Sequence, residues 1–290
     1  MKKKMELLFF LLPVIVLVAL FVYGFIGWSF YTSQTDWKVI GETGKYVGFE
    51  NYKILFSRDR TFKKALFNTL KLSAIFIGCT IPLGLILAIL LDLDIVAKKA
   101  FRIVFLLPLS FSFVASASMW FWMFSPEIGV INSFLKLLGL GFLEQPWITS
   151  GDQSVFCIAV AYIWQFSGFA TLVYYAGISG VSEDIREAAR IDGATRFQEY
   201  WRIVIPMQKP ATLTVLVILL MYSLKVFDLV WLMTGGGPGK SSEVLSTFMY
   251  KTTFSRNFFG RGAAIGIIMF IVSLIIILPF FIRRGESAYE

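Results

Sequence analysis

The sequence predicts an all-α membrane protein with six transmembrane helices in one domain that covers residues 1–290. Hydrophobic residues make up 57% of the chain and charged residues 16%, whereas soluble domains have about 45–50% apolar and about 25% charged residues. The apolar residues form long continuous runs, which favours helices over the alternating pattern of barrel strands. Six runs reach the length of about 20 residues that a helix needs to cross a bilayer.

The first run begins after three lysines, Lys2 to Lys4, so the N-terminus has the appearance of a signal peptide. The run over 7–31 is longer than the apolar region of a signal peptide, and no small-x-small cleavage site ends it. We therefore expect a retained transmembrane helix.

The other five spans are expected at 72–91, 103–124, 155–178, 211–233 and 263–282. An even number of crossings puts both termini on one side of the membrane. With the N-terminus in the cytoplasm, the inner loops hold 13 Lys or Arg in about 60 residues and the outer loops 13 in about 100. The positive-inside rule thus favours cytoplasmic N and C termini. The net charge of +8 fits loops that face anionic lipid, and we expect no nucleic-acid partner.

Catalytic chemistry has little support in this composition. The chain has no histidine, which excludes His-based metal sites and Ser-His-Asp triads. The acidic residues do not cluster in the spans, and the sequence has no Gly-x-x-x-x-Gly-Lys-Ser/Thr phosphate loop. We therefore expect no catalytic residue, no metal site and no cofactor held by this chain.

The inner segment 179–209 is the least ordinary part of the chain. Ser182 is a good N-cap for a short helix that ends at Ile191. Gly193 then interrupts the helix, because glycine permits a turn with positive φ. A second helical stretch follows and carries Phe197 on its apolar side.

Two roles remain open for the first short helix. It presents Ala188 and Ala189 beside Glu187 and Arg190, and small residues allow a partner protein to approach closely. A helix that lies on lipid would instead need a broad face of large apolar residues, and none precedes Phe197. Docking onto a partner protein is therefore favoured.

The same segment resembles the EAA loop of ABC importer permeases. The matching pattern is Glu187-Ala188-Ala189, three residues, Gly193, nine residues, Ile203, one residue, and Ile205-Pro206. The family has Leu-Pro where this chain has Ile-Pro, and Asp192 also fits the family pattern.

Other motifs resemble the carbohydrate branch of that family, of the maltose-transporter type, over nearly the whole chain. They are Val47-Gly48-Phe49-Glu50-Asn51-Tyr52, Asn68-Thr69, Trp122-Met123-Phe124, Gly129-Val130-Ile131-Asn132, Phe227-Asp228 and Thr234-Gly235-Gly236-Gly237-Pro238.

The resemblance implies a type I ABC importer permease in the cytoplasmic (inner) membrane of a bacterium or archaeon, which is a transport subunit and not an enzyme. It implies a second homologous permease in a heterodimer, two cytoplasmic ABC ATPases that bind ATP and Mg²⁺, and an extracytoplasmic solute-binding protein. The implied substrate is a sugar or oligosaccharide, with a polyol or a glycerol-phosphate as the alternative. The implied ATPase-coupling residues are Glu187, Ala188, Ala189, Asp192, Gly193, Ile203 and Pro206, with Glu187 pairing to a basic residue of the ATPase.

Polar and aromatic residues inside the spans are the candidates for a substrate pathway, because aromatic rings cover the apolar face of a sugar and polar groups bind its hydroxyls. The candidates are Trp164, Gln165, Tyr222, Ser223 and Asp228. Asp228 is also expected three residues from Lys225 on one helix, so a structural ion pair is the alternative role.

An ion-driven secondary transporter is the competing interpretation. It would need buried coupling carboxylates and usually an internal repeat. Asp228 is the only clearly intramembrane acid, and the EAA-like loop would have no explanation.

Overall fold

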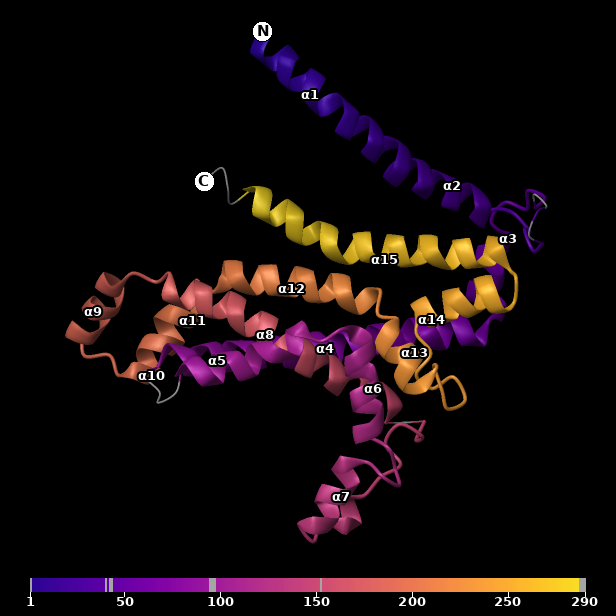
Figure 1. Ribbon diagram of the computed structural model, residues 1–290. Coiled ribbons are helices and arrows are strands. Elements are labelled where there is room, and N and C mark those ends of the chain that lie inside the picture. The colour runs from indigo at the N-terminus through magenta and orange to yellow at the C-terminus, as the bar shows by residue number, and fades with distance from the viewer. Residues whose placement is uncertain (1, 40, 42–43, 94–97, 152, 287–290) are drawn as a thin grey trace. The chain divides into compact units, whose positions relative to one another are not determined.

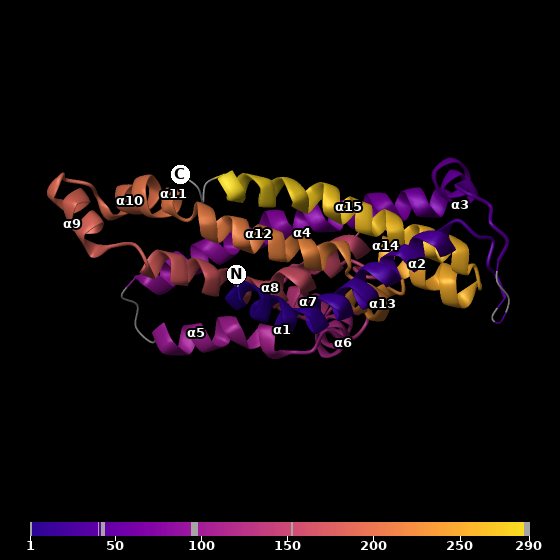
Figure 2. The same cartoon turned by 90° about the horizontal axis from the view of Figure 1, so that it is seen from above.

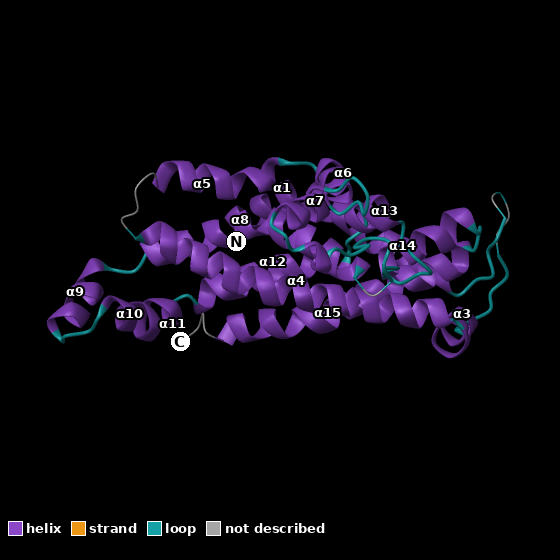
Figure 3. Cartoon of the chain, turned by 90° about the horizontal axis from the view of Figure 1, so that it is seen from below, coloured by secondary structure: helices purple, strands orange, loops and turns teal. Residues whose placement is uncertain are grey.

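The computed structural model describes residues 2–39, 41, 44–93, 98–151 and 153–286, and every regular element in these ranges is a helix (Figures 1 and 3). Strand pairing in the described residues is limited to one isolated bridge between Thr35 and Tyr46. The predicted all-α class is thereby confirmed. The chain divides into two compact units, Met1–Lys63 with Leu245–Val272 and Lys64–Val244 with Ser273–Glu290. The single domain over 1–290 stays a prediction.

Apart from α4, the helical elements that begin in the first unit include three π-helical turns. They are α1 (Lys2–Val18), η1 (Ala19–Tyr23), α2 (Gly24–Ser33), α3 (Glu50–Lys53), η2 (Ile54–Arg58), α14 (Leu245–Tyr250), η6 (Lys251–Ser255) and α15 (Phe259–Glu286).

The second unit holds most of α4 and the middle of the chain. Its elements are α4 (Arg60–Asp92), α5 (Lys98–Leu106), η3 (Leu107–Ser110), α6 (Phe113–Met123), α7 (Val130–Leu137), η4 (Gly141–Leu143), α8 (Ser154–Ser179), α9 (Glu183–Ile191), α10 (Arg196–Glu199), η5 (Tyr200–Val204), α11 (Ile205–Met207), α12 (Lys209–Leu224) and α13 (Asp228–Thr234).

Four helical stretches are long and apolar enough to cross a membrane alone: Phe10–Ser33, Arg60–Asp92, Ser154–Ser179 and Phe259–Phe280. They correspond to the first, second, fourth and sixth predicted spans. Two bent pairs raise the number of candidate spans to six if each pair crosses once. The pairs are α5–η3 with α6, at 102°, and α10–α11 with α12, at 60°.

The predicted third span, 103–124, is wrong as a continuous helix, because the chain bends by 102° between η3 and α6. Pro108 lacks an N–H donor, and the chain is extended at Phe111 and Ser112. The Ser112 Oγ then accepts a hydrogen bond from the Ala115 N–H at 3.1 Å and caps α6. A count of apolar residues misses this turn chemistry.

The predicted fifth span, 211–233, is also interrupted, since α12 ends at Leu224 and α13 begins at Asp228. No proline marks this break. The Tyr162 hydroxyl on α8 donates to the Tyr222 carbonyl at 3.3 Å, and α13 packs against α6. Contacts with α6 and α8 therefore stabilise this break, which the local sequence does not predict.

Close backbone approach lets α4 and α5 pack against α8. A Cβ added at Gly84 of α4 would lie 2.4 Å from the Ala170 Cβ, and one at Gly168 of α8 would lie 2.2 Å from the Phe105 carbonyl oxygen. Small residues at helix contacts are typical of membrane bundles. Figures 1 and 2 show α4, α8 and α12 running side by side in this unit.

Three asparagines in the family-like motifs are buried, and their side chains form hydrogen bonds with backbone carbonyls. Asn51 donates to the Ser33 and Thr35 carbonyls at 2.9 and 2.8 Å within the first unit. In the second unit, Asn68 donates to the Ser241 and Glu243 carbonyls, and Asn132 donates to those of Pro126 and Gln145. These motif positions hold loops in place, because a buried carbonyl without a donor is costly.

Candidate functional site

The turn after α9 is built as the glycine at 193 predicts. Gly193 has a φ of +81°. The Ala194 N–H donates to the Ala189 carbonyl at 2.9 Å, and the Gly193 N–H donates to the Arg190 carbonyl at 3.1 Å. These two bonds form a Schellman motif, which ends the helix and satisfies two of its last carbonyls.

The next helix begins with a capping box that the sequence interpretation did not use. The Thr195 hydroxyl accepts from the Gln198 N–H at 3.3 Å, and the Gln198 side chain accepts from the Thr195 N–H at 2.9 Å. By contrast, the Ser182 side chain makes no capping bond at the start of α9. The pattern Thr-x-x-Gln was the available signal.

The two alanines of the EAA-like motif lie on different faces of α9. Ala189 is buried together with Arg186, three residues earlier. Glu187 and Ala188 are exposed, and so is Ile191, whose residue surface is 85% accessible. One face of α9 therefore packs against the protein while the other is exposed.

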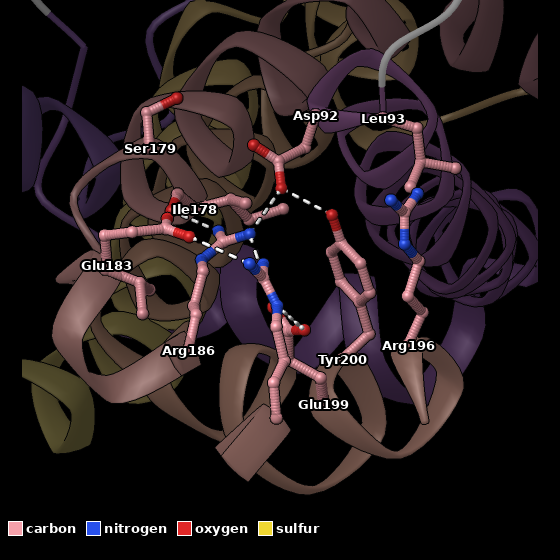
Figure 4. Close-up of a pocket in the computed structure, with 11 residues that line it drawn as sticks. Asp92, Leu93, Ile178, Ser179, Glu183, Arg186, Arg196, Glu199 and Tyr200 are labelled. Atoms are coloured by element: carbon pink, nitrogen blue, oxygen red, sulfur yellow. Dashed lines mark hydrogen bonds and ion pairs between the residues drawn. The ribbon is translucent and has the colours of Figure 1, made fainter. Parts of the chain in front are cut away.

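Buried charged side chains attach the buried face of α9 to the end of α4 (Figure 4). The Arg186 Nη1 lies 2.9 Å from the Asp92 Oδ2, and Nη2 donates to the Ile178 carbonyl near the end of α8 at 3.0 Å. The Tyr200 hydroxyl donates to the same Asp92 oxygen. These residues line a polar cavity of about 460 Å³ together with Glu199.

A second arginine extends the cluster. The Arg190 Nε donates to the Glu199 Oε2 at 3.2 Å, and its Nη1 lies 3.1 Å from the Glu183 Oε1. Glu199 is almost fully buried, so this contact supplies it with a cation. In Figure 4, Arg196 lies beyond Tyr200 and no dashed line reaches it.

The cluster shifts the pKa values of Tyr200, Arg186 and Arg190. Burial and the hydrogen bond to Asp92 raise the pKa of Tyr200 to about 12. Burial lowers the pKa of Arg186, but the hydrogen bond and charge of Asp92 outweigh it, so the net direction is upward. The hydrogen bond and charge of Glu199 raise the pKa of Arg190. Tyr200 therefore stays neutral, and both arginines stay charged, at physiological pH.

The remaining predicted coupling residues come after α9 in the chain. Asp192 and Pro206 are exposed, and Ile203 is half-buried. Phe197 and Trp201 stack with ring centroids 6.2 Å apart and are largely exposed. Phe197 belongs to α10, which contacts α9.

The predicted substrate residues lie near two of the helix breaks, the bend before α6 and the break between α12 and α13. Gln165 is buried, and its Nε2 donates to the Phe111 carbonyl at the break before α6, at 2.9 Å. Ser223 is buried and donates to the Leu220 carbonyl. These two side chains are therefore engaged with backbone.

The other three substrate candidates are more accessible. Trp164 and Tyr222 are half-buried and Asp228 is exposed. The Tyr222 ring lies 4.8 Å from that of Phe166, within the aromatic core of this unit. The three are brought to the same region because α8 contacts the chain on both sides of the breaks.

The alternative of an ion pair between Lys225 and Asp228 is wrong. The two residues are not on one helix, because Lys225 to Phe227 form the break between α12 and α13. The Lys225 Nζ instead lies 5.2 Å from the centroid of the Tyr222 ring. Within the described residues, Lys225 and Asp228 form no ion pair.

Sequence reasoning missed the ionic cluster. Asp92 and Arg186 are 94 positions apart, and no local pattern relates them. The only signal was an acid at the end of an apolar run. No group of three or more acidic, Cys or His side chains suited to a metal lies in the described part of the chain.

The chain resembles known transport proteins over most of its length. Residues 80–286 match the family described as "Binding-protein-dependent transport system inner membrane component". A probable ABC transporter permease protein of Pyrococcus horikoshii is 41% identical over 274 residues, which cover 94% of each chain. The xylose/arabinose import permease protein XacH of Haloferax volcanii is 37% identical over 91% of this chain and 83% of its own.

A solved structure has the same fold at lower identity. A chain of the bacterial alginate ABC transporter, in complex with alginate pentasaccharide-bound periplasmic protein, gives a TM-score of 0.82 at 28% identity. The match covers 96% of this chain and 93% of that chain.

Proposed function

Because the chain belongs to the family of binding-protein-dependent transport system inner membrane components, we propose that it forms half of the pore of an ATP-driven importer for a sugar or oligosaccharide. A second homologous permease forms the other half in a heterodimer. Two cytoplasmic ATPases hydrolyse ATP, and an extracytoplasmic binding protein delivers the solute. ATP-driven closure of the ATPases moves the coupling helices and switches the pore between outward-facing and inward-facing states.

The division of α9 into two faces carries this proposal. Arg186 and Ala189 attach the helix to the protein, while Glu187, Ala188 and Ile191 remain exposed. A helix held on one side and free on the other suits a coupling helix that fits into a groove of the ATPase. The free face then lies in the cytoplasm, and with six crossings both termini lie there too.

Crosslinking from the free face tests the docking. We expect Ala188→Cys, carrying a short bifunctional crosslinker, to capture an ATPase subunit in membranes that express the whole transporter. Val114→Cys is the control, because this residue is exposed on α6, far along the chain from α9. Absence of any ATPase in the Ala188→Cys product would refute the docking.

A charge reversal tests the role assigned to Glu187. We expect Glu187→Lys to abolish uptake and stimulated ATP hydrolysis while the permease still inserts, because its exposed carboxylate pairs with a basic residue of the ATPase. Glu127→Lys, also an exposed acid but outside α9, is the matched control. Normal uptake and stimulation in Glu187→Lys would contradict the pairing.

The sugar class draws on the relatives and on the two helix breaks. One relative is a xylose/arabinose import permease, and the structural neighbour belongs to an alginate transporter. Broken helices commonly line the solute path of transporters, because free backbone groups there can bind polar ligands. Tyr222 and Asp228 lie on either side of one break, with Trp164 on α8.

Uptake measurements test this pathway. We expect Tyr222→Ala and Asp228→Ala to lower the rate or apparent affinity of transport directly. Gln165→Ala is expected to act through the break that it supports at Phe111. Unchanged rate and affinity in all three variants would remove these residues from the pathway.

A further inference from the structure

We propose that Arg186 is a positioning residue that clamps α9 to the inner ends of α4 and α8, so that these three elements move as one body when the ATPases close. The inference rests on the proposed function, because it concerns how a force applied to α9 reaches the spans. It assigns roles to Arg186, Asp92 and Tyr200, which lie outside the EAA-like pattern.

One guanidinium group joins three elements. The Arg186 Nη1 binds Asp92, the last residue of α4, at 2.9 Å, and Nη2 binds the Ile178 carbonyl of α8 at 3.0 Å. Nη1 also lies 3.7 Å from the Glu199 Oε1. The planar fork of arginine supports such bonds in several directions, which the single ammonium of lysine does not.

The Ile178 carbonyl is a favourable acceptor. It belongs to the last turn of α8, where carbonyls lack partners within the helix, and it also accepts a bond from the Val181 N–H at 3.2 Å. The helix dipole also favours a cation at this end. Arg186 thus adds a charged donor at the end of one candidate span and neutralises the acid that ends another.

The clamp is buried, which makes it stiff. The side chains of Arg186 and Asp92 are only 10% and 15% exposed, and that of Glu199 is 2% exposed. Separating a buried pair leaves an uncompensated charge at large cost, whereas exposed pairs separate easily. A displacement of α9 is therefore expected to carry α4 and α8 along.

Tyr200 and Arg190 close the cluster from the other side. Tyr200 donates to Asp92, and its ring centroid lies 5.8 Å from the Arg186 guanidinium carbon. Arg190 binds Glu199, the last residue of α10 and the one directly before Tyr200. The segment after Gly193 is thus attached to the same point as α9, and the two helices around the turn act together.

A distance measurement tests the clamp in the assembled transporter. Spin labels are placed on Leu90→Cys of α4 and Asp184→Cys of α9, both exposed, after Cys79 and Cys157 are replaced by serine and alanine. Pulsed electron spin resonance is recorded without nucleotide and with ATP and vanadate. We expect one narrow distance, the same in both states, for the intact clamp.

Loss of the guanidinium should uncouple the two helices. We expect Arg186→Gln to broaden the distribution and to shift it on addition of ATP and vanadate, with the ATPase still copurifying. Arg186→Lys should restore it only in part, because one ammonium cannot reproduce both bonds. Lys136→Gln is the matched control, because it breaks an exposed ion pair of 3.1 Å elsewhere and should change nothing.

A double variant separates loss of the clamp from misfolding caused by an unpaired buried charge. Asp92→Asn with Arg186→Gln removes both charges, so no buried charge is left without a partner, and it should assemble yet show the same uncoupling. A narrow, state-independent distance in this variant or in Arg186→Gln would overturn the clamp. If the wild-type permease holds no ATPase, the proposed function fails instead, so the two failures are distinguishable.

Discussion

The turn at Gly193 allows a prediction whose magnitude follows from the backbone. Its φ is +81°, and a Cβ added there would meet no atom within 4 Å. A substituted side chain therefore has room, and the cost is backbone strain alone. That strain is about 1–2 kcal/mol for alanine in the left-handed region, and larger for a β-branched residue.

The strain lowers the population of the turn that docks. Because the site is exposed, the chain can relieve the strain by leaving the Schellman conformation, which also releases the bond from Ala194 to Ala189. A cost of about 1–2 kcal/mol corresponds to a factor of about 5–30 in the population ratio. The apparent affinity for the ATPase should fall by a similar factor where the docking-competent form becomes a minority.

The assay is reassociation of purified ATPase with the detergent-solubilised permease pair, measured as an apparent Kd. We expect affinity to fall in the order Gly193, Gly193→Asn, Gly193→Ala and Gly193→Val, because asparagine tolerates the left-handed region better than other side chains. Wild-type affinity in Gly193→Val, or equal losses in Gly193→Asn and Gly193→Val, would refute the reasoning.

Three other predictions concern local structure. Gln165→Leu leaves the Phe111 carbonyl without its donor and should cost about 1–3 kcal/mol, seen as a lower Tm in detergent; an unchanged Tm would show that the bond contributes nothing. Thr195→Ala removes the cap of α10 and should cost about 0.5–2 kcal/mol by denaturant unfolding, with Thr195→Ser as the near-neutral control; equal losses in both would contradict the cap. The raised pKa of Tyr200 should stabilise the fold below its ordinary value of 10.0, and this contribution should be lost as pH rises from there through about 12. Tyr200→Phe should remove that component from the pH profile of unfolding, and an identical profile in the variant would assign it to another group.

Several features followed from local chemistry. Continuous apolar runs predicted the helices now seen as α4 and α8, since a run of that length can satisfy its backbone only as a helix in lipid. The turn at Gly193 followed from a glycine between two helical stretches. The type I permease fold, predicted from motif resemblance, is confirmed by the likeness to the alginate transporter chain.

The helix breaks show where local reasoning stops. Pro108 and Ser112 indicate the bend before α6, but the continuous apolar run over 103–124 led to the prediction of one unbroken helix. The break after Leu224 has no such signal, because it is held by α6 and by the hydroxyl of Tyr162. Its position therefore could not be read from the residues that form it.

The sequence by itself determined the helical class, the family and the exposed motif around Glu187 and Gly193, because each depends on composition or on neighbours along the chain. Only the tertiary structure decided which alanine of that motif faces inward, and that Arg186 meets Asp92. The physical reason is that a buried charge takes its partner from whatever element packs against it, and that element lies 94 residues away.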